Sequence, residues 1–281
     1  MKKIYMDYAS SADIASANAG SVHDFGVREK NKLETARMSV SKILDAHKDE
    51  IVFTSGATES NNLAILGLVQ NFKNPHIVTT NIEHASVLEV FKHLEKTKQA
   101  RVTYVSVESN GLVDSESIKK VLSKDTVLVS VMYANNEIGT IQPLREIVKE
   151  IRHFNKINNT RIYFHTDATQ AVNYLPINVE KLGVDLMSWN SAKIYGPKGV
   201  GALYVRRGTP ISKIMFGGDQ ENGLRPGTEN ILGAVAMAKA MTAVESLKEK
   251  EVIRLTKLRD YFFSKLEVIF KKNLSSSLVI N

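Results

Sequence analysis

The chain has 281 residues, of which 43% are hydrophobic and 24% charged, and its formal net charge is +7. This length is sufficient to bury a large core and lies near the upper limit for a single core, so we expect one large globular domain. The sequence contains no cysteine. That excludes a disulfide framework, a thiolate metal site and a cysteine nucleophile supplied by this chain.

The sequence gives no support for a membrane or nucleic-acid function. No apolar stretch is long enough to cross a bilayer, and no apolar run follows the two lysines near the start. The basic residues alternate with glutamate around residues 92–101, 145–156 and 239–259, and no nucleic-acid-binding motif accompanies them. We therefore expect a cytoplasmic protein with no membrane and no nucleic-acid partner.

Short runs rich in β-branched residues predict seven strands, and longer segments with apolar residues three and four apart predict helices between many of them. The predicted strands are 51–54, 77–80, 102–105, 127–132, 162–165, 186–189 and 200–205, and the predicted helices are 29–46, 58–70, 84–98, 115–123 and 143–157. This alternation predicts an α/β fold with a mostly parallel seven-stranded sheet and helices on both faces. Ligands of such sheets lie at the carboxyl ends of the strands.

The pattern changes after residue 229. Two consecutive helical segments are predicted, over residues 229–247 and 248–272, and residues 278–281 resemble the start of a further strand.

A phosphate-binding turn is predicted where the strand 51–54 meets the next helix. Gly56 permits a tight turn, and the free N–H groups of the helix start would face an anion. The alternative is an ordinary capped helix start, with Thr58 or Ser55 as N-cap. A second glycine-rich segment, residues 196–201, lacks the lysine and hydroxyl pattern of a nucleotide loop, and we predict a turn into the last strand there.

Asp167 follows the apolar strand 162–165 and precedes an alanine. A carboxylate in this position is partly desolvated and needs a cationic partner. The protonated pyridine nitrogen of pyridoxal 5′-phosphate is such a partner. The alternative is that Asp167 caps a following helix.

Lys193 lies just past the strand 186–189 and is followed by a turn at Gly196 and Pro197. We expect its side chain to be shielded from water, which favours the neutral amine that forms Schiff bases. The alternative is a surface lysine.

His84 lies between the strand 77–80 and a helix, where an imidazole can cover a cofactor ring or transfer protons. Its alternative is a helix-capping or solvent-facing histidine. The histidines show no ligand spacing such as HExxH, so no catalytic metal is predicted.

In this order, the motifs resemble those of the cysteine desulfurases, within the class-V aminotransferase family of fold-type-I pyridoxal-phosphate enzymes. The likeness runs from Tyr5–Ala9 to about Lys248 and is strongest in Glu50–Asn62, Asn135–Gly139, Asp167–Gln170, Val184–Met187, Lys193–Gly201 and Arg225–Thr228. It implies the large domain of fold type I over residues 1–247, and a helix over 248–281 that leads into a small domain largely missing from this chain.

The resemblance also assigns roles. It implies pyridoxal 5′-phosphate as cofactor, with Lys193 as the Schiff-base lysine, Asp167 on the pyridine nitrogen and His84 stacked on the ring. It places Asn136 and Gln170 beside the ring, Ala57 and Thr58 at the phosphate, Asn190 at a cofactor-contacting position where the family has serine, and Thr228 at the phosphate of the neighbouring subunit's site, which implies a homodimer.

The implied activity is sulfur transfer from L-cysteine, giving alanine and a persulfide for iron–sulfur cluster or thio-cofactor assembly, with a sulfur-acceptor or scaffold protein as partner. Two departures stand against it. Ala192 replaces the family's phosphate-binding histidine, and the family's cysteine and carboxylate-binding arginine would lie beyond Asn281. The segment between Asp7 and Asn18 is also shorter than the family pattern.

Three hypotheses follow. The chain is a desulfurase whose thiol comes from elsewhere, a class-V lyase or aminotransferase that needs no cysteine, or a non-catalytic subunit that keeps the fold.

Overall fold

The computed structural model describes residues 17–273, with side chains up to residue 269. Its centre is a seven-stranded sheet in the order β1-β7-β6-β5-β4-β2-β3. The strands are β1 (Ile51–Thr54), β2 (His76–Thr80), β3 (Arg101–Val105), β4 (Thr126–Ser130), β5 (Tyr163–Asp167), β6 (Leu186–Asn190) and β7 (Gly201–Val205). β7 is antiparallel to both neighbours, and the other pairs are parallel. The α/β class and the seven predicted strands are confirmed, each within two residues.

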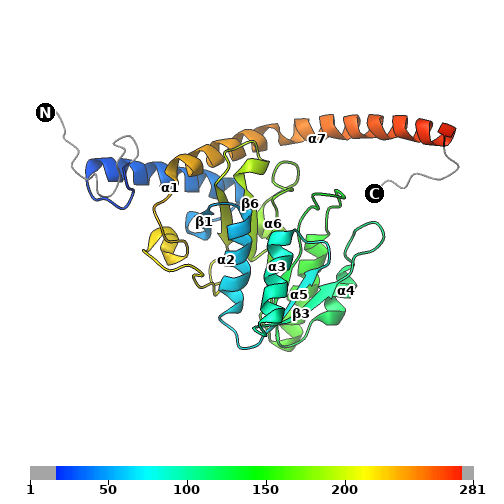
Figure 1. Ribbon diagram of the computed structural model, residues 1–281, viewed down its shortest axis with the longest axis horizontal. Helices are drawn as coiled ribbons and strands as arrows, with labels where there is room; N and C mark the ends of the chain where they lie inside the picture. Colours follow the sequence, from blue (N-terminus) through cyan, green and yellow to red (C-terminus); the bar gives the residue numbers. More distant parts are fainter. Residues whose placement is uncertain (1–16, 274–281) are drawn as a thin grey trace.

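Helices cover both faces of this sheet (Figure 1). They are α1 (Asp24–Leu44), α2 (Ala57–Val69), α3 (Ala85–Lys96), α4 (Ser115–Val121), α5 (Leu144–Asn158), α6 (Val179–Leu182) and α7 (Ile231–Asn273), with short 3-10 turns at Lys48–Glu50 (η2), Ser191–Lys193 (η3) and Gln220–Gly223 (η4). The cores of α2 and α3 form one apolar cluster with the sheet, and α1, α4, α5, α6 and α7 form the other. The five predicted helices are confirmed, while α6, a single turn, was not predicted.

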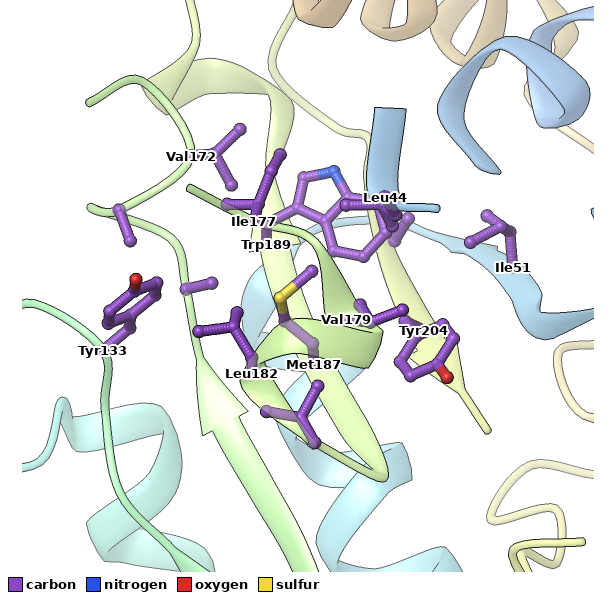
Figure 2. Packing of buried hydrophobic residues seen from close by; sticks show 14 of the residues in the cluster. Leu44, Ile51, Tyr133, Val172, Ile177, Val179, Leu182, Met187, Trp189 and Tyr204 are labelled. Carbon is purple, nitrogen blue, oxygen red and sulfur yellow. The ribbon is translucent and has the colours of Figure 1, made fainter. Parts of the chain in front are cut away.

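The strands are held in place by large side chains that alternate between the two faces. Met187 and Trp189 of β6 point into the cluster on the α1 side, while Leu186 belongs to the cluster on the α2 side. Figure 2 shows Trp189 and Met187 with Tyr204 of β7 and Leu44 of α1. Because these residues are fully buried, the carboxyl ends of β5 and β6 have a fixed position from which Asp167 and Asn190 emerge.

The two helices predicted after residue 229 are wrong, because α7 is one continuous helix of 43 residues. No glycine or proline occurs after Gly233 to break it. An ion pair at i,i+3 spacing, Glu245–Lys248 at 2.5 Å, bridges the predicted junction, and a second, Glu251–Arg254 at 2.8 Å, lies just after it. The predicted domain boundary at residue 247 falls inside this helix and stays a prediction, and the predicted strand at 278–281 lies outside the described residues.

The two halves of α7 differ in surroundings. The first half packs along α1 and buries Met237 and Met241, whereas Leu258, Tyr261 and Phe262 of the second half are exposed, and the helix extends beyond the sheet (Figure 1). In the part of the chain that the structure describes, no helix has an apolar stretch that could cross a membrane.

Candidate cofactor site

A cavity of about 120 Å³ lies at the carboxyl ends of β4, β5 and β6. Eight of the nine predicted site residues line it, namely Ala57, Thr58, His84, Asn136, Asp167, Gln170, Asn190 and Lys193. Ser86, Met132, Ala134 and Thr169 complete the lining. Segments from residue 57 to residue 193 therefore converge on one small polar space.

The amino end of α2 forms one side of this cavity. Gly56 occupies the N-cap position and no side chain caps the helix there, so the alternative in which Ser55 or Thr58 caps it is wrong. The first N–H groups of a helix have no intrahelical acceptor, which leaves those of Ala57 and Thr58 suited to an anion. A Cβ atom at Gly201 would lie 2.6 Å from the Cα of Gly56, so the predicted turn into β7 needs its last glycine to let this loop approach.

Asp167 lies at the floor of the cavity and is only 5% exposed. Its Oδ2 accepts a hydrogen bond from Asn61 Nδ2 at 2.8 Å, and its Oδ1 accepts one from the N–H of Thr169 at 2.9 Å. The residues after Asp167 form a turn and not a helix, so the alternative in which Asp167 caps a following helix is wrong. A carboxylate has about four acceptor positions, so each oxygen retains capacity for another donor.

No ion pair to Asp167 is found among the described residues. Its ionisable neighbours, Glu83 and His165, supply no compensating charge. Burial raises the pKa of Glu83 to about 8, and burial lowers the pKa of His165 to about 4, so both are uncharged at neutral pH. An unpaired buried carboxylate is costly, and Asp167 therefore fits a ligand that brings a cationic N–H.

His84 is the N-cap of α3, as its alternative predicted. Its Nδ1 accepts a hydrogen bond from the N–H of Ser86 at 3.1 Å and lies 2.8 Å from Ser86 Oγ. The ring is exposed and lines the cavity, so helix capping and a role at the cavity are compatible.

Lys193 ends η3 and lines the cavity, but it is exposed. The expectation that the protein shields it from water is therefore wrong for this structure. The reason is that β6 ends at Asn190, and the chain then turns at the surface, with Tyr195 at a positive φ of 61°. Asn190 Oδ1 accepts a hydrogen bond from the N–H of Ala192 at 3.0 Å, and the carbonyl of Lys193 accepts one from Asn173.

Asn136 is presented by a turn that its neighbour builds. Asn135 Oδ1 accepts hydrogen bonds from the N–H groups of Glu137 and Ile138 at 2.8 and 3.0 Å, and its Nδ2 donates to the carbonyl of Ile82 at 3.0 Å. The turn is thus tied to the segment that carries His84.

The family described as Aminotransferase class-V matches residues 1–274. The chain belongs to the class-V aminotransferase family. It is 44% identical to "Cysteine desulfurase IscS" of Dictyoglomus turgidum over 282 residues, which cover 95% of this chain and 70% of that relative. It is 40% identical to "Cysteine desulfurase IscS 1" of Archaeoglobus fulgidus, with 91% and 69% covered.

A solved structure described as "NIFS-LIKE PROTEIN" superposes with a TM-score of 0.85 at 40% identity and covers 89% of this chain and 68% of that one. "SspA in complex with cysteine" superposes with a TM-score of 0.76 at 36% identity, covering 80% and 64%. The chain is therefore a homologue of cysteine desulfurases, with the large-domain fold of pyridoxal-phosphate fold type I.

Thr228 is the one predicted site residue that does not line the cavity. It is exposed on a loop held by two ion pairs. Buried Arg37 and Glu221 form a two-pronged pair at 2.7 Å, and Arg225 Nε lies 3.0 Å from Glu59 Oε1 on the first turn of α2. Its predicted contact with a neighbouring subunit stays a prediction.

A larger groove of about 840 Å³ runs along the second half of α7. Its lining includes Tyr174, Leu255 and Phe262, and no carboxylate or imidazole among the described residues. No group of three or more potential metal ligands was found in residues 17–273. The smaller cavity of this aminotransferase-family chain is therefore the better candidate for chemistry.

Sequence reasoning missed Asn61, Ser86 and Asn135, which orient the cavity's polar groups. One signal was available for Asn61. It lies between Ala57 and Ala64 on the buried stripe of α2, where a polar residue needs a reason.

Proposed function

We propose that the cavity holds pyridoxal 5′-phosphate and that this chain is the cofactor-bearing part of a cysteine desulfurase. The observation that carries the proposal is Asp167, a buried carboxylate without a cationic partner in the described chain. The uncapped amino end of α2 and the amine of Lys193 line the same cavity. These three groups match the ring nitrogen, the phosphate and the aldehyde of that cofactor.

Bound there, the cofactor would supply an electron sink for bonds at the α-carbon of an amino acid. Asp167 would hold the pyridine nitrogen in its protonated form, the N–H groups of Ala57 and Thr58 would hold the phosphate, and Lys193 would hold the aldehyde carbon. Asn136 and Gln170 would orient the ring from the side, and His84 would cover one face. The exposure of Lys193 fits a residue that is covered only by the group it holds.

L-cysteine is the proposed substrate, because the chain is similar to proteins named cysteine desulfurase and to a structure named as a complex with cysteine. The C–S bond of the substrate breaks, an external thiolate takes the sulfur as a persulfide, and alanine leaves. Since the 281 residues contain no cysteine, the thiolate comes from another segment or polypeptide. We propose a homodimer in which Thr228 contacts the neighbouring site, and an acceptor that passes sulfur to iron–sulfur cluster or thio-cofactor assembly.

The test is alanine formation from L-cysteine by the cofactor-loaded protein, with and without an added thiol-bearing acceptor protein. Alanine and acceptor persulfide in equal amounts, formed only when the acceptor is present, would support the proposal. If the protein turns over other amino acids without a thiol-bearing acceptor and does not turn over cysteine, the proposal is overturned in favour of a class-V lyase or aminotransferase.

A non-catalytic subunit is the second candidate. The observation that favours it is the rim of the cavity, where Asn190 is half-buried, Lys193 is exposed, and exposed Ala192 stands where the family has a histidine. Failure of the purified protein to bind the cofactor at all, while it still folds and dimerises, would decide for this candidate.

A further inference from the structure

We infer that Asn61 and Ser86 form a hydrogen-bonded bridge from Asp167 to His84 that fixes the tautomer of the His84 ring, with its hydrogen on Nε2. The bridge is a property of the polypeptide itself. Only its use, an N–H donor held at the edge of the cavity, rests on the proposed function.

Asp167 fixes the first link. Asn61 is fully buried, and its Nδ2 lies 2.8 Å from both Asp167 Oδ2 and Ser86 Oγ. A carboxylate accepts hydrogen bonds and does not donate them. The reversed amide would place Asn61 Oδ1 against the carboxylate oxygen, so the side chain has one acceptable orientation.

The second link follows from the first. Because Asn61 Nδ2 donates to Ser86 Oγ, the hydroxyl hydrogen of Ser86 is free to donate to His84 Nδ1, 2.8 Å away. The backbone N–H of Ser86 donates to the same nitrogen at 3.1 Å. A ring nitrogen that accepts carries no hydrogen, so the neutral imidazole carries it on Nε2.

The bridge has a structural cost that argues against a packing role. Asn61 Oδ1 is buried without a hydrogen-bond partner in the described chain, and an unpaired buried oxygen is unfavourable. Leucine has nearly the same shape and would avoid that loss on the buried stripe of α2. Asn61 therefore acts through its two donors, as a positioning residue for both Asp167 and His84.

This bridge gives His84 a defined chemical task. Its Nδ1 is engaged at the start of α3, and the remaining nitrogen presents a donor. Within the proposed function, His84 donates from Nε2 to an acceptor atom of the amino-acid substrate, such as its carboxylate. Asn61, Ser86 and Asp167 come from α2, α3 and β5, respectively. The bridge therefore holds the Nε2 donor of His84 at a fixed position relative to the Asp167 carboxylate.

The test measures the His84 tautomer by long-range ¹H–¹⁵N NMR on the cofactor-free protein labelled with ¹⁵N-histidine. The spectra are recorded at about pH 8.5, where free imidazole is neutral, and the His84→Gln variant identifies the signals of His84. The wild type is expected to show the Nε2–H form. Ser86→Ala should lower the ratio of Nε2–H to Nδ1–H by about fivefold, the value of one net hydrogen bond, and Asn61→Leu should lower it less, in the same direction.

Asn62→Leu is the matched control, because Asn62 is the next residue of α2 and its Nδ2 bonds only to the carbonyl of Thr58. It should leave the His84 signals unchanged. An Nδ1–H ring in the wild type, or unchanged signals in both bridge variants, would overturn the inference. If Asn61→Leu does not fold, Ser86→Ala decides. Because no cofactor is present, failure of the proposed function would leave this result standing, and the reverse holds too.

Discussion

The two walls of the cavity are built differently. The inner wall consists of Ser86 and Asp167 with Asn61 behind them. These residues are at most 8% exposed and are joined by hydrogen bonds of 2.8 Å across α2, α3 and β5. The outer wall, Asn190–Lys193, is a single 3-10 turn after β6, and its Lys193 and Ala192 are exposed.

Two positions at which this chain differs from the family pattern at the cofactor, Asn190 and Ala192, lie on the outer wall. Asp167, which would pair with the ring nitrogen of the proposed cofactor, lies on the inner wall, where buried hydrogen-bond partners set the orientation of its side chain. We therefore expect the buried inner wall to set both the orientation and most of the affinity of the proposed cofactor, while the exposed outer wall can change without disturbing the core.

Replacing the inner-wall carboxylate should have the largest effect. Asp167→Asn removes the charge that pairs with the ring nitrogen and is expected to weaken binding of pyridoxal 5′-phosphate by about 10- to 150-fold, the equivalent of ~1.5–3 kcal/mol for a charged hydrogen bond. Equilibrium titration of the protein with the cofactor measures it. Asp114→Asn, at the half-buried start of α4 and outside the cavity, is the control. If Asp167→Asn and the wild type bind pyridoxal 5′-phosphate with equal affinity, the inner wall does not contribute more to binding than the outer wall.

The buried surroundings of Asp167 should also affect the pH dependence of stability, because buried Glu83 interacts with its charge. Burial raises the pKa of Glu83 from 4.5 to about 8, so the folded state holds a proton that the unfolded state loses. Stability from this group is complete below pH 4.5 and is lost as the pH rises through 8. His165, whose pKa burial lowers to about 4, has the opposite effect, but only below about 6.5.

Between pH 6.5 and 8, the free energy of unfolding is therefore expected to fall by about 2 kcal/mol, as measured by urea denaturation. Glu83→Gln retains an acceptor for Thr80 and Met132 and should abolish the fall. Glu89→Gln, on the exposed side of α3, should retain it. A wild type whose stability is constant over this range would show that Glu83 is ionised in the fold.

The smallest effect is expected at the outer wall. Ala192→His restores the family's phosphate-binding residue at an exposed position, so the affinity for pyridoxal 5′-phosphate should rise by no more than about tenfold. The same titration checks it, with inorganic phosphate as competitor. A larger gain would mean that the outer wall limits binding more than its exposure suggests.

Strand periodicity and helix starts are local features, so the sequence was sufficient to predict the strands. Most of the residues that gather at the strand ends were assigned by the resemblance to the cysteine desulfurases. The sequence did not predict the bridge, since Asn61 meets Asp167 across 106 residues and Ser86 across 25. It also misjudged Lys193, whose exposure depends on where β6 stops relative to the surface. The continuity of α7 was predictable from the lack of glycine and proline after Gly233, but the changing pattern of apolar residues suggested two helices.

Lys193 is the residue that we propose to hold pyridoxal 5′-phosphate in this cavity. The most direct measurement is the mass of the intact protein after incubation with the cofactor and reduction with borohydride, followed by mapping of the modified peptide. We expect one cofactor per chain on Lys193 in the wild type and none in Lys193→Ala. Lys198 is an exposed lysine five residues further on, and Lys198→Ala should load normally. Loading of the wild type on another lysine, or no loading, would contradict this proposal.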